Sequence, residues 1–151
     1  MFWICIAAVV ILDQLTKYAV AANLALGQSW PLIDGVVYFT YVMNKGAAFS
    51  LLQGQRWFFI VITIVVLAVM LWFARGIPKS DRLLQSTLAL FCGGALGNLI
   101  DRLRFGAVTD FIDFRFFPIF NVADSCIVIG AFLLGFCMLI RPKIGATKDD
   151  I

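Results

Sequence analysis

The sequence predicts an all-α membrane protein with four transmembrane helices and a small extracytoplasmic β-element. Of its 151 residues 62% are hydrophobic and only 14% are charged, against roughly 25% charged in an average soluble domain. Four apolar segments are also close to the 20 residues that a helix needs to cross a hydrocarbon core of about 30 Å. The excess apolar residues must therefore face lipid. At this length we expect one domain, residues 1–151.

The first predicted helix covers residues 1–22, which begin with twelve uninterrupted apolar residues and then admit Asp13, Gln14 and Lys17. A cleavable signal peptide is the alternative interpretation of this segment. No Lys or Arg precedes Lys17, so the basic start of a signal peptide is missing, and Asp13 falls where its apolar region would end. We therefore interpret the segment as a membrane helix.

The other three predicted helices are residues 57–74, 83–101 and 119–140. The second has a single threonine as its polar residue. The third is mostly apolar but contains several polar side chains. The fourth is long enough to span a bilayer, although it carries Asn121 and Asp124 near its start.

The connections differ in length and character. Residues 23–56 include a stretch rich in β-branched and aromatic residues, 36–42, followed by a turn signal at 44–46. These features predict a small sheet or hairpin that rests on the membrane surface. The second and third helices are joined by a short basic loop, 75–82, and the third and fourth by residues 101–118.

The density of basic residues predicts the orientation. Loop 75–82 and the C-terminal tail hold six Lys and Arg in about 19 residues, whereas the opposite side holds five spread over some 50 residues. The raw counts alone would not decide between the two sides. Their density predicts that the short loop and both termini are cytoplasmic, with no support from a basic segment ahead of the first helix.

Composition excludes several kinds of chemistry. The net charge of +3, without a basic tract interleaved with aromatics, gives no reason to expect a nucleic-acid partner. Histidine is absent, which removes the commonest general base and zinc ligand, and all nine acidic residues are aspartates.

The cysteines lie in apolar runs without a C-x-x-C spacing, so we expect small hydrophobic side chains in helices rather than disulfides or metal ligands. They are Cys5, Cys92, Cys126 and Cys137. We expect no metal and no cofactor.

Threading the chain through four helices collects most of its intramembrane polar residues in one layer, at the outer end. Several are spaced three or four apart and so share a helix face. A charged residue deep in a bilayer costs on the order of 3 kcal/mol or more, so such residues usually face the bundle interior and mark function. The polar layer contains Asp13, Lys17, Asn44, Asn98, Asp101, Arg102, Asp110, Asn121 and Asp124.

A purely structural role is the alternative for part of this layer. Asp13 with Lys17, or Asp101 with Arg102, could form ion pairs that merely hold helices together. The G-x-x-x-G pattern at residues 93–97 similarly favours close helix packing over catalysis.

Asp110 and Asp124 differ from these residues because neither has a basic residue within four positions. Two carboxyl groups brought close together share a proton. The ionised one can take a proton from water while the protonated one donates to a carbonyl oxygen, as in aspartic proteases. Helix capping is the alternative role for Asp124, since aspartate favours helix N-termini.

Five sequence blocks, in order and with compatible spacing over roughly residues 10–130, resemble the motifs of the lipoprotein signal peptidase (signal peptidase II) family. Any one block would be a weak signal, but the five together are highly specific. They are D-Q-L-T-K at 13–17, N-K-G-A-A-F at 44–49, G-G-A-L-G-N-L-I-D-R at 93–102, G-A-V-T-D-F at 106–111 and F-N-V-A-D-S at 120–125.

The resemblance implies an aspartic endopeptidase of the bacterial inner membrane, with its active site near the outer face. Its substrate would be a prolipoprotein carrying diacylglycerol on the lipobox cysteine, cut just before that cysteine, and a globomycin-type cyclic peptide would inhibit it. By the same resemblance, the catalytic dyad would be Asp110 and Asp124. Residues that line the site or orient substrate would be Asn44, Asn98, Arg102 and Asn121, supported by Asp13, Lys17 and Asp101.

Two other classes of protein are compatible with four polar-lined helices. A small proton-coupled transporter would use carboxyl groups as a relay, but here the polar residues gather at one face and the second helix is nearly bare. A structural subunit of a larger assembly would have no activity alone.

Overall fold

The structure is a computed structural model that describes residues 1–46 and 54–140. Four helices in this part of the chain are long and apolar enough to cross a membrane, and a three-stranded sheet accompanies them. The predicted fold class is thus confirmed. The elements, in chain order, are α1 (Phe2–Asn23), β1 (Ser29–Ile33), β2 (Val37–Asn44), α2 (Arg56–Ala74), α3 (Arg82–Phe105), β3 (Val108–Asp113) and α4 (Val122–Ile140).

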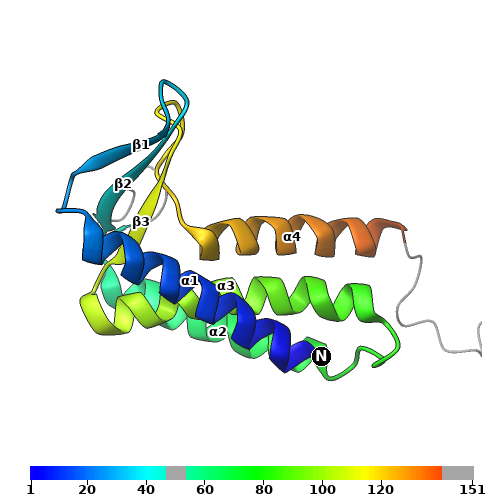
Figure 1. Ribbon diagram of the computed structural model, residues 1–151. Coiled ribbons are helices and arrows are strands. Elements are labelled where there is room, and N and C mark those ends of the chain that lie inside the picture. Colours follow the sequence, from blue (N-terminus) through cyan, green and yellow to red (C-terminus); the bar gives the residue numbers. More distant parts are fainter. Residues whose placement is uncertain (47–53, 141–151) are drawn as a thin grey trace, which may run out of the picture.

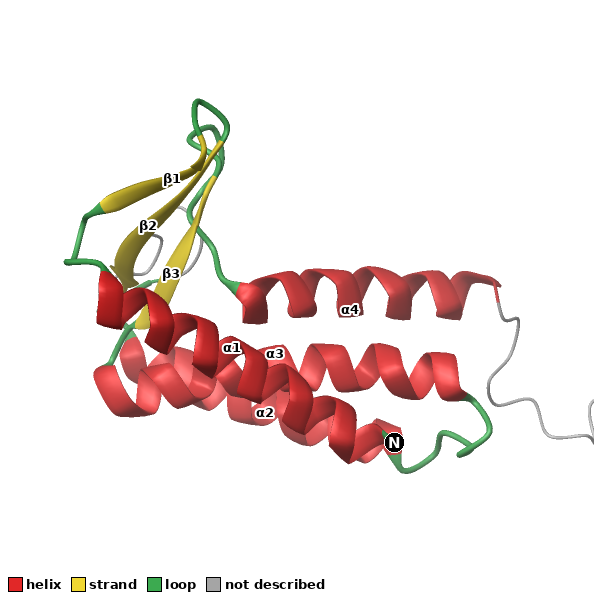
Figure 2. Ribbon diagram, viewed as in Figure 1, coloured by secondary structure: helices red, strands yellow, loops and turns green. Residues whose placement is uncertain are grey.

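The helices run side by side and the sheet stands at one end of the bundle (Figure 1). The N-terminus, the α2–α3 connection and the last turn of α4 lie at the opposite end (Figure 1). Figure 2 shows that the sheet leans away from the helix axes rather than continuing them. We call the end that carries the sheet the site end.

Helix α3 is the centre of the bundle and packs against α1, α2 and α4. Glycines allow close approaches: a Cβ on Gly93 would lie 2.7 Å from Val9 Cβ, and one on Gly97 would lie 2.6 Å from Asp13 Oδ2. A Cβ on Gly94 would overlap the carbonyl oxygen of Ala123. The prediction that the glycine pattern serves helix packing is confirmed. Helix α2 is peripheral, and Ile60 is its only buried residue.

The core is apolar at one end and polar at the other. Away from the sheet, buried side chains of α3 such as Leu84 and Leu88 pack with Ile6 of α1 and Cys137 of α4. All four cysteines are free and lie in helices, as predicted. At the site end the interior is filled by aspartates, asparagines and a lysine instead.

Two helix boundaries differ from the prediction by more than one residue. Helix α3 extends to Phe105, four residues further, and ends where Gly106 adopts a left-handed conformation with φ of 73°. Helix α4 begins at Val122, three residues later than predicted. Phe120 pairs with Ile112 of β3, and this strand pairing keeps it out of the helix.

The sheet is antiparallel in the order β1-β2-β3. The sequence pattern predicted only the central strand. Strand β3, interpreted as loop, contains polar residues whose partners come from β2, so its strand character depends on non-local pairing. The predicted turn at 44–46 is present at its start, where Asn44 Oδ1 accepts a hydrogen bond from Gly46 N (2.9 Å). Residues 47–49 of the second sequence block, and the basic tail used to predict orientation, lie outside the described residues.

Candidate active site

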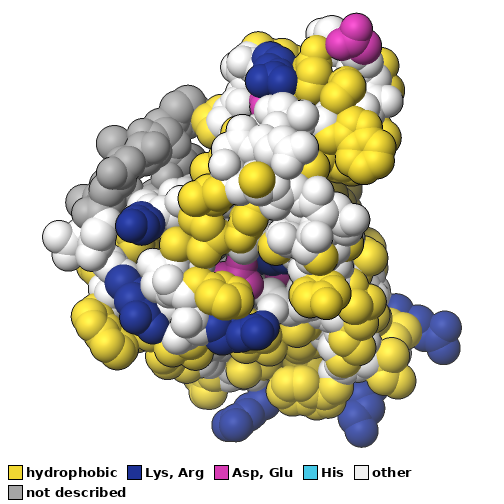
Figure 3. Space-filling view, turned by 60° about the vertical axis from the view of Figure 1, so that its left-hand side comes forward, with side chains coloured by type: hydrophobic (Ala, Val, Ile, Leu, Met, Phe, Trp, Pro, Cys, Tyr) yellow, Lys and Arg dark blue, Asp and Glu magenta, His cyan; other side chains and the backbone are white. Residues whose placement is uncertain are grey.

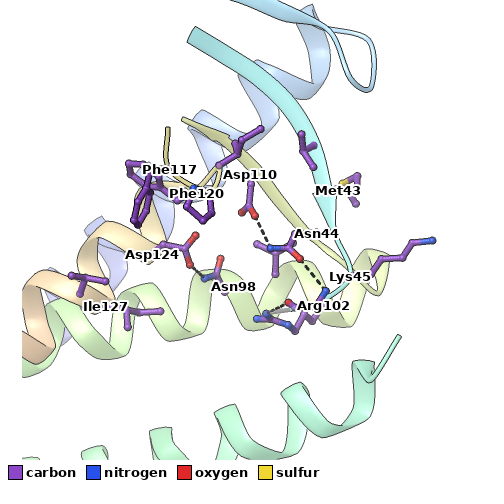
Figure 4. A pocket seen from close by; sticks show the side chains of 16 residues that line it. Met43, Asn44, Lys45, Asn98, Arg102, Asp110, Phe117, Phe120, Asp124 and Ile127 are labelled. Atoms are coloured by element: carbon purple, nitrogen blue, oxygen red, sulfur yellow. Dashed lines mark hydrogen bonds between the residues drawn. The ribbon is translucent and has the colours of Figure 1, made fainter. Parts of the chain in front are cut away.

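A cavity of about 660 Å³ opens at the site end between the sheet, α3 and α4. One part of its wall is polar and another is apolar (Figure 4). The polar residues are Asn44, Lys45, Asn98, Arg102, Asp110 and Asp124, and the apolar ones include Val42, Phe117, Ile119, Phe120, Ile127 and Val128.

Strand pairing positions Asp110. Val42 lies opposite Asp110, and Asn44 lies opposite Val108. Alternate residues of a strand share a face, so Asn44 and Asp110 both face the cavity. Asp110 is 3% exposed. Its Oδ2 accepts a hydrogen bond from Asn44 Nδ2 (2.9 Å), and its Oδ1 accepts one from Asn121 Nδ2 (2.7 Å).

The surroundings of Asp110 favour its neutral form. Burial, and then the negative charge of Asp124, raise its pKa from the usual 3.8 to about 7, although the amides of Asn44 and Asn121 and the charge of Lys17 oppose the rise. A large fraction of Asp110 is therefore protonated at neutral pH.

Asp124 lies in the first turn of α4 and caps it together with Asn121. Asn121 Oδ1 accepts from Asp124 N (2.8 Å), and Asp124 Oδ2 accepts from Asn121 N (3.2 Å), which is the reciprocal arrangement of a capping box. The capping role considered for Asp124 is thus present. It does not occupy the whole side chain, because Asp124 also lines the cavity and its Oδ1 accepts from Asn98 Nδ2 (2.7 Å).

Asn121 fixes the positions of the two aspartates relative to each other. Its side chain is fully buried. Besides the bond to Asp110, its Nδ2 lies 3.1 Å from Asn98 Oδ1 and 3.2 Å from the carbonyl oxygen of Thr109. One amide thereby links β3, α3 and the N-terminus of α4.

Lys17 is the cation at the centre of the polar layer. Its Nζ lies 2.9 Å from Asp13 Oδ2, 3.2 Å from Asp101 Oδ2 and 2.9 Å from Asn98 Oδ1. The ion pair between Asp13 and Lys17 is as anticipated. In the described part of the chain Asp101 pairs with Lys17, and no ion pair joins it to Arg102.

The two aspartates that neutralise Lys17 also hold backbone. Asp13 Oδ1 accepts from Ala123 N (2.9 Å), at the start of α4, and Asp101 Oδ2 accepts from Thr109 N (2.9 Å), at the start of β3. They lie outside the cavity and position the elements that carry Asp124 and Asp110.

Arg102 brings positive charge to the cavity wall. Its guanidinium stacks 4.9 Å from the ring centroid of Phe59, and its Nη2 lies 3.4 Å from the carbonyl oxygen of Gly46. Of the nine predicted site residues, five therefore line the cavity, while Asn121, Asp13, Lys17 and Asp101 support them from behind.

Two kinds of residue were not predicted. Gln14 joins the polar layer, since its Nε2 donates to Asp101 Oδ1 (2.9 Å) and lies 3.3 Å from the carbonyl oxygen of Gly97. Its polarity within an apolar helix was the available signal. The apolar wall, including Phe117 and Ile127, carried no signal, because hydrophobic residues are ubiquitous in this sequence. Within residues 1–46 and 54–140, no three Asp or Cys side chains come together as a metal-ligand set.

Comparison with known proteins assigns the sequence to a family. The family model for signal peptidase (SPase) II matches residues 5–140. The chain belongs to the signal peptidase II family. A lipoprotein signal peptidase of Caldanaerobacter subterraneus subsp. tengcongensis is 51% identical over 142 residues, covering 93% of this chain and 97% of that protein. One from Bacillus pumilus is 48% identical over 155 residues, covering 99% of each.

Solved structures agree with the fold. A bacterial membrane enzyme superposes with a TM-score of 0.85 at 36% identity, covering 97% of this chain and 94% of that one. Another structure of a bacterial membrane enzyme gives 0.83 at 37% identity. The resemblance to signal peptidase II found in five short blocks therefore extends over nearly the whole chain. In the structure all five blocks contribute residues to the polar layer.

Proposed function

We propose that this protein is an aspartic endopeptidase of the bacterial inner membrane that releases signal peptides from prolipoproteins, with Asp110 and Asp124 as the catalytic dyad. Membership in the signal peptidase II family supports the peptidase activity. The aspartic mechanism is carried by one observation. Asp110 and Asp124, from different elements, line the same cavity, and their carboxyl groups face it together (Figure 4).

Different roles for the two carboxyl groups follow from their surroundings. Asp124 lies at a helix N-terminus, which favours a negative charge, and Lys17 is linked to it through Asn98. Asp110 is 3% exposed, whereas Asp124 is partly exposed, and the pKa of Asp110 is near 7. We assign Asp124 as the general base and Asp110 as the group that carries the shared proton, while their titration belongs to the pair.

The reaction then needs only the chain's own residues and a water molecule. Asp124 takes a proton from water as the water oxygen attacks the scissile carbonyl carbon, and Asp110 donates its proton to the carbonyl oxygen. The tetrahedral intermediate collapses when Asp124 gives its proton to the amide nitrogen and the C–N bond breaks, so that the amine leaves. Asp110 takes back a proton from one hydroxyl group as the carbonyl forms again, which restores the dyad. Asn44 and Asn121 keep Asp110 in place throughout, and Arg102 orients the peptide.

The two-part wall of the cavity supports a lipid-modified substrate. A peptide next to the polar part would place its diacylglyceryl chains along half-buried Ile127 and exposed Val128 of α4. A globomycin-type cyclic peptide would occupy the same cavity. We further propose that the site end faces outward and that both termini are cytoplasmic, on the density of basic residues in the opposite loop and tail.

The direct test uses the purified protein in detergent and two substrates, a prolipoprotein with diacylglycerol on its lipobox cysteine and the same chain without it. We expect a shortened product from the modified substrate alone. Equal cleavage of both substrates would contradict the lipid requirement, and cleavage of neither would contradict the proposed peptidase. A proton-coupled transporter would instead acidify or alkalise proteoliposomes without cutting either substrate.

A further inference from the structure

Basic side chains lie around the site end, outside the ion pairs of the polar layer. Lys45 follows β2, Arg56 begins α2 and Arg104 lies in the last turn of α3; we call these three residues the basic rim. Figure 3 shows several Lys and Arg side chains on one face, next to exposed hydrophobic side chains. In the described part of the chain, the aspartates at the site end form ion pairs within 4.0 Å with Lys17 and Arg115, and none of these pairs includes a residue of the rim.

Arg56 is the most constrained member of the rim. Its Nη2 donates to the carbonyl oxygen of Leu103 (2.8 Å), at the end of α3, and its side chain packs over Gly106. Its Nε is buried and has no hydrogen-bond partner among the described residues. The residue as a whole is partly exposed, so the rest of its guanidinium can meet an acceptor from outside this part of the chain.

Aromatic residues place the rim at the boundary of the membrane. The guanidinium of Arg56 lies 5.5 Å from the ring centroid of Trp57, and that of Arg104 lies 4.9 Å from that of Phe105. Both rings are largely exposed. Exposed aromatics and long basic side chains at helix ends are typical of the headgroup level, where the ring rests in the interface and the charge reaches water.

We propose that the basic rim is an interaction surface for the phosphodiester headgroups of anionic phospholipids, with Arg56 as its central contact. Charge complementarity supports this partner, because three unneutralised cations face the layer in which lipid phosphates lie. The planar guanidinium also matches the geometry of phosphate oxygens. The proposal concerns lipid binding and does not depend on the proposed catalytic dyad.

Trp57 provides a local readout of this surface. In a protein whose other tryptophans are replaced by phenylalanine, Trp57 fluorescence would be measured in vesicles of phosphatidylcholine and phosphatidylglycerol, one of which is brominated in its acyl chains. We expect brominated phosphatidylglycerol to quench Trp57 at a lower mole fraction than brominated phosphatidylcholine. Arg56→Gln should lower this preference about five-fold, the effect expected for one basic residue near an anionic surface.

Trp72 is the matched control, since it lies near the other end of the same helix and is 71% exposed, against 69% for Trp57. Quenching of a protein that retains only Trp72 should not change with Arg56→Gln. Because Arg56 also caps α3, Lys45→Gln with Arg104→Gln tests the rim with that cap intact and should likewise lower the preference at Trp57. Equal quenching of Trp57 by the two lipids, or an unchanged preference in either rim variant, would overturn the proposal.

Discussion

Lys17 and Asp124 are joined through a single side-chain amide. Lys17 Nζ donates to Asn98 Oδ1 (2.9 Å), and Asn98 Nδ2 donates to Asp124 Oδ1 (2.7 Å). An ammonium group can only donate, so it fixes which end of the Asn98 amide faces Asp124. A cation on α1 thereby sets the hydrogen bonding of a carboxyl group on α4, although the two residues are 107 positions apart in the sequence.

The dyad assignment predicts that Asp110→Asn and Asp124→Asn each abolish cleavage of a lipid-modified prolipoprotein. Asparagine is nearly isosteric, and at position 124 its carbonyl oxygen can still accept from Asn121 N, so the cap of α4 should survive. It can neither take a proton from water nor share one, so either change should cost nearly as much as both together. Cleavage would be measured alongside expression and thermal stability in detergent.

Asp113→Asn is the matched control for these variants. Asp113 lies on the same strand as Asp110 and is also buried, but its carboxyl group accepts from Thr40 Oγ1 (2.7 Å) and Arg115 N (2.8 Å), and it does not line the cavity. We expect it to retain substantial activity. Near wild-type cleavage by the Asp110 or Asp124 variant would show the dyad to be wrong, and Asp101 would become the next candidate.

The raised pKa of Asp110 predicts a pH dependence of stability. Because its folded-state pKa is about 7 instead of the usual 3.8, its contribution to stability is full below about pH 4 and is lost as the pH rises through 7. Asp110→Asn is neutral at every pH and avoids this loss. The melting temperature of the variant, relative to the parent, should therefore increase between pH 5 and pH 8.5. A constant difference over this range would contradict the raised pKa.

Removing Lys17 alone should be more damaging than removing it with a partner. Lys17→Gln leaves Asp13 and Asp101 buried without their counter-ion, and breaking a buried pair in this way costs about 3–5 kcal/mol. We expect Lys17→Gln to lower detergent thermal stability strongly, and Lys17→Gln with Asp13→Asn to recover part of the loss. A double variant that is less stable than the single variant would indicate that the ion pair is not the dominant interaction of Lys17.

The close contact at Gly94 gives a prediction about stability that involves no charged group. Gly94→Ala should destabilise the protein by about 1–3 kcal/mol, because the added Cβ would overlap the backbone of Ala123 and force α3 and α4 apart. Gly135→Ala is the matched control on α4, since nothing lies within 4 Å of the Cβ it would add. Equal melting temperatures for the two variants would argue against the close contact between α3 and α4.

The proposed orientation can be tested with single cysteines in a background that lacks the native four. Ser80 lies in the α2–α3 connection and Asp34 in the turn between β1 and β2, and both are exposed. With an impermeant thiol reagent on intact cells, we expect labelling of Asp34→Cys and none of Ser80→Cys until the cells are opened. The reverse pattern would overturn the orientation.

The sequence by itself determined the number and approximate position of the membrane helices, because 20 consecutive apolar residues have few other stable uses. It also predicted which polar residues gather in one buried layer. A buried carboxylate or lysine is costly enough to stand out in an apolar sequence, and the spacing of Asp13 and Lys17 on one turn of a helix is local.

The tertiary structure decided which of those residues contact one another and which face the cavity. Strand β3 depends on its pairing with β2, and that register places Asn44 and Asp110 on one face. The choice of Lys17 over Arg102 as the partner of Asp101 likewise depends on how α1 packs against α3, which no local pattern encodes. The apolar wall of the cavity was not predictable either, because lipid-facing and cavity-facing hydrophobic residues look alike until the helices and the sheet are assembled.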